Sequence, residues 1–198
     1  MQLSAALVIL VATIAYSLIG LFGSPKLIDR SLFRPYWLLR RKQYDTVFLS
    51  GLAHADLMHL IFNMMTFYFF AFPLERYIGG TLFVVLYLAG LLISHAWTYY
   101  KQQRNPEYAS LGASGAISAV LFAAIVFFPN QSLFILPIPV PIPAPLFAVL
   151  YLAYTYWAAK NERGRINHDA HLGGAITGLL FVAVVAPSAY GNLLNSIF

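Results

Sequence analysis

Long apolar runs alternate with short polar segments along the chain, and this alternation predicts its elements. A helix that crosses a bilayer needs about 20 mostly apolar residues. Six runs approach that length, and we expect spanning helices at about residues 3–22, 55–74, 81–100, 114–128, 143–159 and 170–187. The run at 114–128 is short for a lipid-facing helix, so we expect it at the centre of a bundle. The predicted fold class is therefore all-α, a polytopic membrane protein whose six-helix bundle forms a single domain over residues 1–198.

The composition excludes a soluble or disordered chain. Of the 198 residues, 60% are hydrophobic and 10% are charged, against about 45–50% apolar and 25% charged in soluble domains. The lipid bilayer is thus the expected surrounding. The 12 Lys and Arg exceed the 7 Asp and Glu, but they lie in short loops rather than on one stripe, so we expect no nucleic-acid partner. The chain has no cysteine, which rules out disulfides and thiolate metal sites.

Two connections have distinctive compositions. The first loop, residues 23–53, mixes aromatic and basic residues, above all in the segment Arg34–Lys42, and we expect it to lie in the membrane interface. In the fourth loop, prolines alternate with apolar residues from Leu136 to Pro145, which bars a helix and favours an extended turn. No internal repeat is visible, so an inverted-repeat transporter has no support.

Polar side chains at the start of the second run are candidates for function, because polarity is costly in a spanning helix. His54 precedes the run, and His59 and Asn63 are four residues apart, which puts them on one helical face. Taken alone, either residue is explained as well by hydrogen bonding to a neighbouring helix.

Ser114 marks the start of the fourth run. It lies between Gly112 and Gly115, which permit a tight turn and close approach of another chain. Backbone N–H groups at a helix N-terminus, together with the helix dipole, could hold a developing oxyanion. A serine here is also an ordinary N-cap, so this pattern alone is weak.

The sixth run has His171 near its start and carries Gly174 and Gly178 on one face, a spacing that permits close contact with another helix. The small residues after Gly112 are the natural partner. Six consecutive spans put the starts of the second, fourth and sixth on one side of the membrane. His59, Ser114 and His171 are therefore expected at similar depth.

A serine and a histidine at one depth can act as nucleophile and base without a carboxylate. The imidazole of His171 would accept the Ser114 proton and return it to the leaving amine. His59, Asn63 and the backbone N–H of Ser114 would donate hydrogen bonds to the tetrahedral oxyanion.

These residues match a known family. The chain resembles the rhomboid intramembrane serine proteases in His54-Ala-Asp-x-x-His59-x-x-x-Asn63, Glu75-Arg76-Tyr-Ile-Gly79, Gly112-Ala-Ser114-Gly115 and Ala170-His171-x-x-Gly174-x-x-x-Gly178. The motifs occur in family order over residues 50–178, and six spans equal the minimal bacterial core. The resemblance implies a Ser114–His171 dyad and an oxyanion hole of His59, Asn63 and the Ser114 N–H. It also implies supporting roles for His54, Gly112, Gly115, Gly174 and Gly178. It implies transmembrane protein substrates, no cofactor and no metal.

The resemblance also draws attention to the fifth span and to two departures. Substrate is expected to pass the fifth span, where Tyr151, Tyr154 and Trp157 would shape a lateral gate. Many rhomboids carry Trp-Arg in the first loop, about where this chain has Tyr44-Asp45. A tyrosine four residues after the nucleophile often stacks on the imidazole, but that position is Ser118 here, so His171 must be oriented by other groups.

The family resemblance and the distribution of basic residues imply opposite membrane orientations. The resemblance implies a multi-pass protein of the cell (inner) membrane whose site opens to the periplasmic or outer face. Eleven of the twelve Lys and Arg fall on the first, third and fifth loops, and the positive-inside rule would put that same face in the cytoplasm.

Readings from other classes stay open. A metal or proton transporter would use the His and Asp side chains near two helix starts, which are His54, Asp56, His59, His168, Asp169 and His171. It leaves Ser114 and its glycines without a role. A catalytically inactive rhomboid-like protein that binds membrane clients would keep the fold alone. A metalloprotease is disfavoured because no His-Glu-x-x-His occurs. The sequence indicates neither the substrate nor the oligomeric state.

Overall fold

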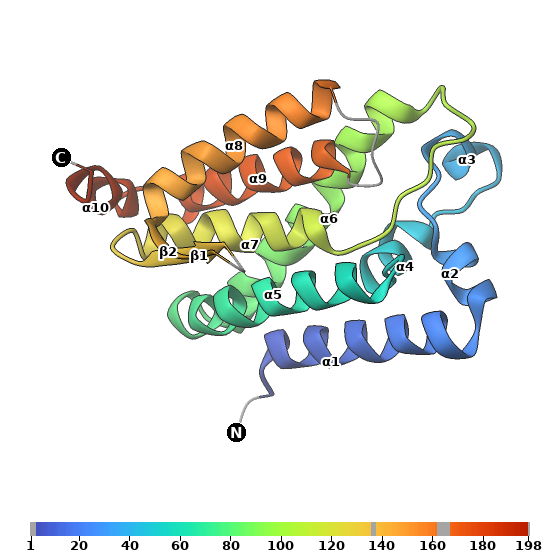
Figure 1. Ribbon diagram of the computed structural model, residues 1–198, viewed down its shortest axis with the longest axis horizontal. Coiled ribbons are helices and arrows are strands. Elements are labelled where there is room, and N and C mark those ends of the chain that lie inside the picture. The colour runs from blue at the N-terminus through green and yellow to red at the C-terminus, as the bar shows by residue number, and fades with distance from the viewer. Residues whose placement is uncertain (1–2, 136–137, 162–166, 198) are drawn as a thin grey trace.

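The computed structural model describes residues 3–135, 138–161 and 167–197. Its elements are, in order, α1 (Ala5–Leu18), the π-helical turn η1 (Ile19–Gly23), α2 (Pro25–Ser31), α3 (Pro35–Arg40), α4 (Thr46–Leu52), α5 (Leu57–Ile78), α6 (Gly80–Gln102), α7 (Ser114–Phe127), β1 (Ser132–Ile135), β2 (Ile138–Pro143), α8 (Ala144–Asn161), α9 (His168–Val185) and α10 (Ala189–Asn195). The long helices run side by side and α7 lies among them (Figure 1).

Each expected span overlaps one of the helices α1, α5, α6, α7, α8 and α9, and the predicted helical membrane bundle is confirmed. Among the described residues, four helices are long and apolar enough to cross a membrane: Ala5–Gly23, Leu57–Ile78, Gly80–Gln102 and His168–Val185. α7 has only 14 residues, and α8 is less apolar because it carries tyrosines, a tryptophan and Lys160-Asn161. Large apolar side chains such as Phe69, Leu180 and Val184 lie exposed on the outside of the bundle, as lipid-facing residues do.

The ends of the spans differ from the expected ones where polar side chains cap the helices. α5 begins at Leu57 because the Asp56 carboxylate accepts a hydrogen bond from the His59 N–H (2.8 Å). It continues past Pro73 to Ile78, four residues beyond the expected end. α9 begins two residues early, at His168, because the Asn167 side chain accepts from the Ala170 N–H (3.0 Å).

α7 forms the core of the bundle, as its short apolar run predicts. Every residue from Gly115 to Val126 is buried, and α5, α6 and α9 surround it. Its contact with α9 is made by backbone: a Cβ on Gly174 would meet the Gly115 carbonyl, and one on Gly178 would meet the Ala119 carbonyl. The two helices therefore touch at a distance that only glycine allows.

The first loop folds into the short helices α2, α3 and α4. Arg40 lies over the Tyr36 ring (4.0 Å) and Arg41 over the Trp37 ring (3.8 Å), a pairing of aromatic and cationic groups typical of the headgroup region. Asp45, one of the two departures from the family pattern, forms an ion pair with Arg30 (3.2 Å). This pair joins α2 to the start of α4.

The fourth loop contains an antiparallel hairpin of β1 and β2, in which Ser132 pairs with Pro143 and Leu133 with Ile142. The prolines of β2 are accommodated because the strand has only one neighbour. The predicted extended chain is therefore found over Ile138–Pro143, whereas Leu136 and Pro137 lie outside the described residues.

Glu75, near the C-terminal end of α5, caps the N-terminus of α1. Its carboxylate accepts hydrogen bonds from the Ser4 hydroxyl (2.5 Å), the Ala5 N–H (2.6 Å) and the Ala6 N–H (3.2 Å). These N–H groups have no partner within their own helix. One side chain thus joins the first two long helices.

We predict that Glu75→Ala lowers the free energy of unfolding by about 1–3 kcal/mol, because the α1 amides lose their acceptor. Thermal unfolding of the purified protein in detergent measures the effect. Glu107→Ala, at an exposed glutamate whose side chain is not hydrogen-bonded within the described residues, is the matched control. Equal stability of the two variants would contradict a capping role.

Gly174→Ala is predicted to destabilise the bundle by about 1–3 kcal/mol or more, since its methyl group meets a backbone carbonyl that cannot rotate aside. Gly191→Ala on α10 is the control, because a Cβ there meets nothing within 4 Å. Thermal unfolding of both variants should separate them. A melting temperature for Gly174→Ala at or above that of the control would mean that the helices can move apart freely.

Candidate active site

The first turns of α5 carry two of the predicted residues. His59 is half-buried and Asn63 is buried. The Asn63 side-chain amide donates to the His59 carbonyl (3.1 Å), which fixes Asn63 against its own helix. As the four-residue spacing predicts, both lie on one face of α5.

His54, between α4 and α5, is fully buried. Its Nδ1 lies 3.0 Å from the Ser17 hydroxyl of α1, which itself donates to the Leu52 carbonyl (2.7 Å). The His54 ring meets the edge of the His59 ring, with centroids 4.9 Å apart. Burial, and secondarily the nearby His59, lowers the pKa of His54 to about 3. The imidazole of His54 is therefore neutral at pH 7 and packs against the His59 ring.

Gly112 lies against His59 because its backbone conformation permits it. Its φ is +115°, a value that favours glycine, and a Cβ there would lie 2.7 Å from His59 Cε1. The Gly112 N–H donates to the Ser50 carbonyl (2.8 Å), which ties this turn to α4. Two residues later the chain enters α7 at Ser114, which is half-buried. The turn therefore brings the start of α7 beside His59.

His171 lies in the first turn of α9. Asn167 caps this turn, and its amide also donates to Thr98 of α6 (3.0 Å). A Cβ on Gly115 would lie 3.3 Å from the Ala170 carbonyl. The residues next to Ser114 and next to His171 are thus in contact, and the two helices begin at the same level, as the small-residue pattern predicts.

The sequence-predicted residues consequently gather at one end of the bundle, on three helix starts. In the described residues Ser114 and His171 are not hydrogen-bonded to each other. The His171 ring instead stacks on Tyr151 of α8, with centroids 6.4 Å apart and an interplanar angle of 24°.

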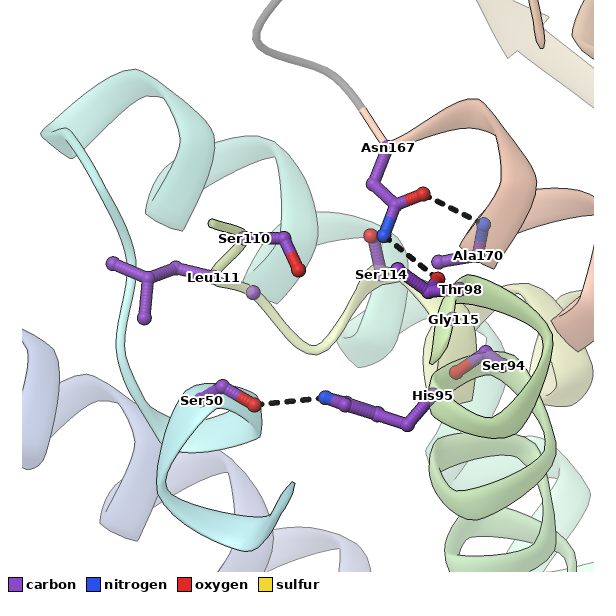
Figure 2. A pocket seen from close by; sticks show the side chains of 11 residues that line it. Ser50, Ser94, His95, Thr98, Ser110, Leu111, Ser114, Gly115, Asn167 and Ala170 are labelled. Atoms are coloured by element: carbon purple, nitrogen blue, oxygen red, sulfur yellow. Dashed lines mark hydrogen bonds between the residues drawn. The ribbon is translucent and has the colours of Figure 1, made fainter. Parts of the chain in front are cut away.

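Figure 2 shows a small polar pocket behind Ser114. Its volume is about 10 Å³, which is close to the space that one water molecule needs. Polar side chains from several helices line it: Ser50, Ser94, His95, Thr98, Ser110, Ser114 and Asn167. In this pocket the Ser50 hydroxyl lies 2.8 Å from His95 Nε2.

Of these lining residues, sequence reasoning selected only Ser114. His95 matched no motif, but its Nδ1 lies 2.7 Å from the Leu91 carbonyl and its ring meets the edge of Phe33 (4.3 Å). Ser50, Thr98 and Asn167 come from three different segments. Polar residues at the ends of apolar helices could have drawn attention to these three. That they line one pocket depends on the fold and could not be seen in the sequence.

The acidic residues required by a transporter have other partners. Asp56 caps α5, and Asp169 forms an ion pair with Lys101 of α6 (2.6 Å). In the part of the chain that the structure describes, no three His, Cys, Asp or Glu side chains gather as metal ligands would. The two carboxylates of the predicted His and Asp set are therefore engaged with a helix terminus and with a lysine.

Comparison with known proteins identifies the family. A family model described as the Rhomboid domain matches residues 41–188, which contain every predicted site residue. The chain belongs to the rhomboid family. A rhomboid helical bundle with several apolar helices is a multi-pass membrane protein, and this part of the expected localisation is confirmed.

Curated rhomboids show the same relationship. Rhomboid protein 1, mitochondrial, of Saccharomyces cerevisiae is 32% identical over 186 residues, covering 85% of this chain and 52% of that protein. RHOMBOID-like protein 12, mitochondrial, of Arabidopsis thaliana is 33% identical over 66% of this chain and 43% of its own length. The human presenilin-associated rhomboid-like protein, mitochondrial, is 31% identical, and the match covers 68% of this chain and 36% of that protein. The chain thus spans about half or less of these rhomboids.

We predict that acid destabilises this rhomboid in part through His54. The unfolded chain protonates His54 near pH 6.5, whereas the folded chain keeps it neutral down to about pH 3. Between these values the unfolded state binds more protons, so stability falls as the pH falls, by up to about 1.4 kcal/mol per pH unit. Melting temperatures of the wild type and His54→Gln from pH 7 to 4 measure this, and parallel curves would contradict it.

Proposed function

We propose that the chain is an intramembrane serine protease that hydrolyses peptide bonds in or near transmembrane segments of membrane proteins. The observation that carries the proposal is the glycine contact between α7 and α9, since it brings the N-terminal turns bearing Ser114 and His171 together inside the bundle. Membership in the rhomboid family supports the same reaction class.

In the proposed reaction, His171 acts as general base and Ser114 as nucleophile. The imidazole takes the hydroxyl proton as Ser114 Oγ bonds to the carbonyl carbon of the substrate. The tetrahedral intermediate then collapses, the C–N bond breaks, and His171 returns the proton to the leaving amine. Water hydrolyses the resulting acyl-enzyme by the same route. The polar pocket behind Ser114 is suited to hold that water.

The oxyanion would be bound by His59, Asn63 and the Ser114 N–H. Asn63 and His59 share one face of α5, and Ser114 is the first residue of α7, where N–H groups lack helical partners. One such donor contributes about 2.7–4 kcal/mol of transition-state stabilisation in other enzymes. Buried His54 and the turn at Gly112 both contact the His59 ring, and these contacts would hold His59 in place as a donor.

The substrate class follows from the surroundings of the site. Because the proposed reacting groups lie inside a helical membrane bundle, a substrate would reach them from the lipid or from the membrane interface. Tyr154 and Trp157 of α8 are about half exposed, which suits residues that meet a transmembrane segment. Transmembrane proteins are therefore the proposed substrates.

A second candidate function is an inactive rhomboid that binds membrane clients. Its supporting observation is that no hydrogen bond joins Ser114 and His171 among the described residues. The two functions differ in whether Ser114 is an activated nucleophile.

The experiment that tests the protease is labelling with a fluorophosphonate in detergent, followed by peptide mapping. We expect one adduct on Ser114, and its loss in both Ser114→Ala and His171→Ala while these variants keep the melting temperature of the wild type to within a few degrees. A drop in labelling of about 10³-fold or more is expected for His171→Ala, since the serine loses its base.

Ser110→Ala serves as the control, because Ser110 lines the same pocket outside the helix. A folded wild type that gives no adduct with several probes from pH 6 to 9 would favour the client-binding protein. Labelling that persists in His171→Ala would mean that another group activates Ser114.

A further inference from the structure

Three side chains from three helices form a connected row beside the proposed dyad. The Tyr151 ring of α8 stacks on the His171 ring of α9, with centroids 6.4 Å apart and planes 24° from parallel. The Tyr151 hydroxyl lies 3.1 Å from the Ser118 hydroxyl of α7. Ser118 lies one helical turn after Ser114, so the row runs from a neighbour of the proposed nucleophile to His171, the proposed base.

The Tyr151 ring is held on other sides as well. Phe122 of α7 lies with its centroid 5.4 Å from that of Tyr151, and Phe147 of α8 lies at 5.7 Å. Ser118 and Phe122 are both buried. Because α7 is enclosed in the bundle, these contacts fix the tyrosine relative to the helix that carries Ser114.

The His171 ring needs such a support. The acidic residue of its helix, Asp169, is paired with Lys101. Among the described residues no carboxylate is hydrogen-bonded to the imidazole of His171, and its ring neighbours are Tyr151 and the edge of His168 (5.9 Å). A general base is effective only when its orientation toward the nucleophile is fixed.

We propose that Tyr151 is the positioning residue of His171, with Ser118 as the anchor of its hydroxyl. The stacked ring restricts rotation of the imidazole, and the small side chain at position 118 leaves the space that the Tyr151 hydroxyl occupies. This inference rests on the proposed function, because it concerns the base of the same reaction.

The test compares fluorophosphonate labelling rates at Ser114, and kcat and KM on a reporter membrane protein, in Tyr151→Leu, Tyr151→Phe and Ser118→Ala. Tyr151→Leu should slow labelling and lower kcat on the order of 10- to 100-fold with KM unchanged, since the base is misoriented. Tyr151→Phe keeps the stack and should lose only about fivefold or less. Tyr156→Leu, at an exposed tyrosine of the same helix, is the control and should match the wild type.

Coupling gives a second, independent measurement. Tyr151→Phe removes the hydrogen bond that Ser118→Ala also removes, together with the one to Thr155, so the double variant should lose no more than Tyr151→Phe alone. This comparison holds even if Tyr151→Leu proves unstable, because both substitutions are small.

Three outcomes decide the matter. A folded Tyr151→Leu that labels at the wild-type rate would overturn the positioning role and leave the protease intact. Losses that multiply in the double variant would also overturn it. A folded wild type without any adduct at Ser114 would overturn the proposed protease, and the positioning role with it.

Discussion

The close approach of α7 and α9 is the constraint on which the rest of the structure depends. Gly174 lies against the Gly115 carbonyl and Gly178 against the Ala119 carbonyl, so the helices meet backbone to backbone. Backbone atoms cannot rotate aside as side chains can. The contact that holds the bundle together therefore also sets the relative position of Ser114 and His171.

Much of this arrangement could be predicted from the sequence, because it depends on local patterns. Apolar runs indicated the long helices, and the small residues around Ser114 and after His171 indicated the helix contact. The four-residue spacing of His59 and Asn63 put them on one face. The helix ends were less predictable: Asp56 and Asn167 act as caps, and a sequence pattern gives such ends only to within a few residues.

Contacts between distant side chains could not be predicted. Ser118 and Tyr151 are 33 residues apart, and Ser50 and His95 are 45 apart; no periodicity links either pair. The sequence shows that position 118 lacks the tyrosine common in the family. It does not show that Tyr151 of α8 takes the place beside the His171 ring. The roles of the site residues and the side of the membrane on which the site opens stay predictions.

Glu75 also bears on the order in which the molecule can be completed. The amides at the start of α1 find their acceptor on a side chain about 70 residues later in the chain. A nascent chain that has inserted α1 alone must leave these amides to water at the membrane surface, since lipid offers no acceptor. Synthesis of α5 supplies the carboxylate long before α9 exists. The first two long helices can therefore be joined before the helix that carries His171 has been made.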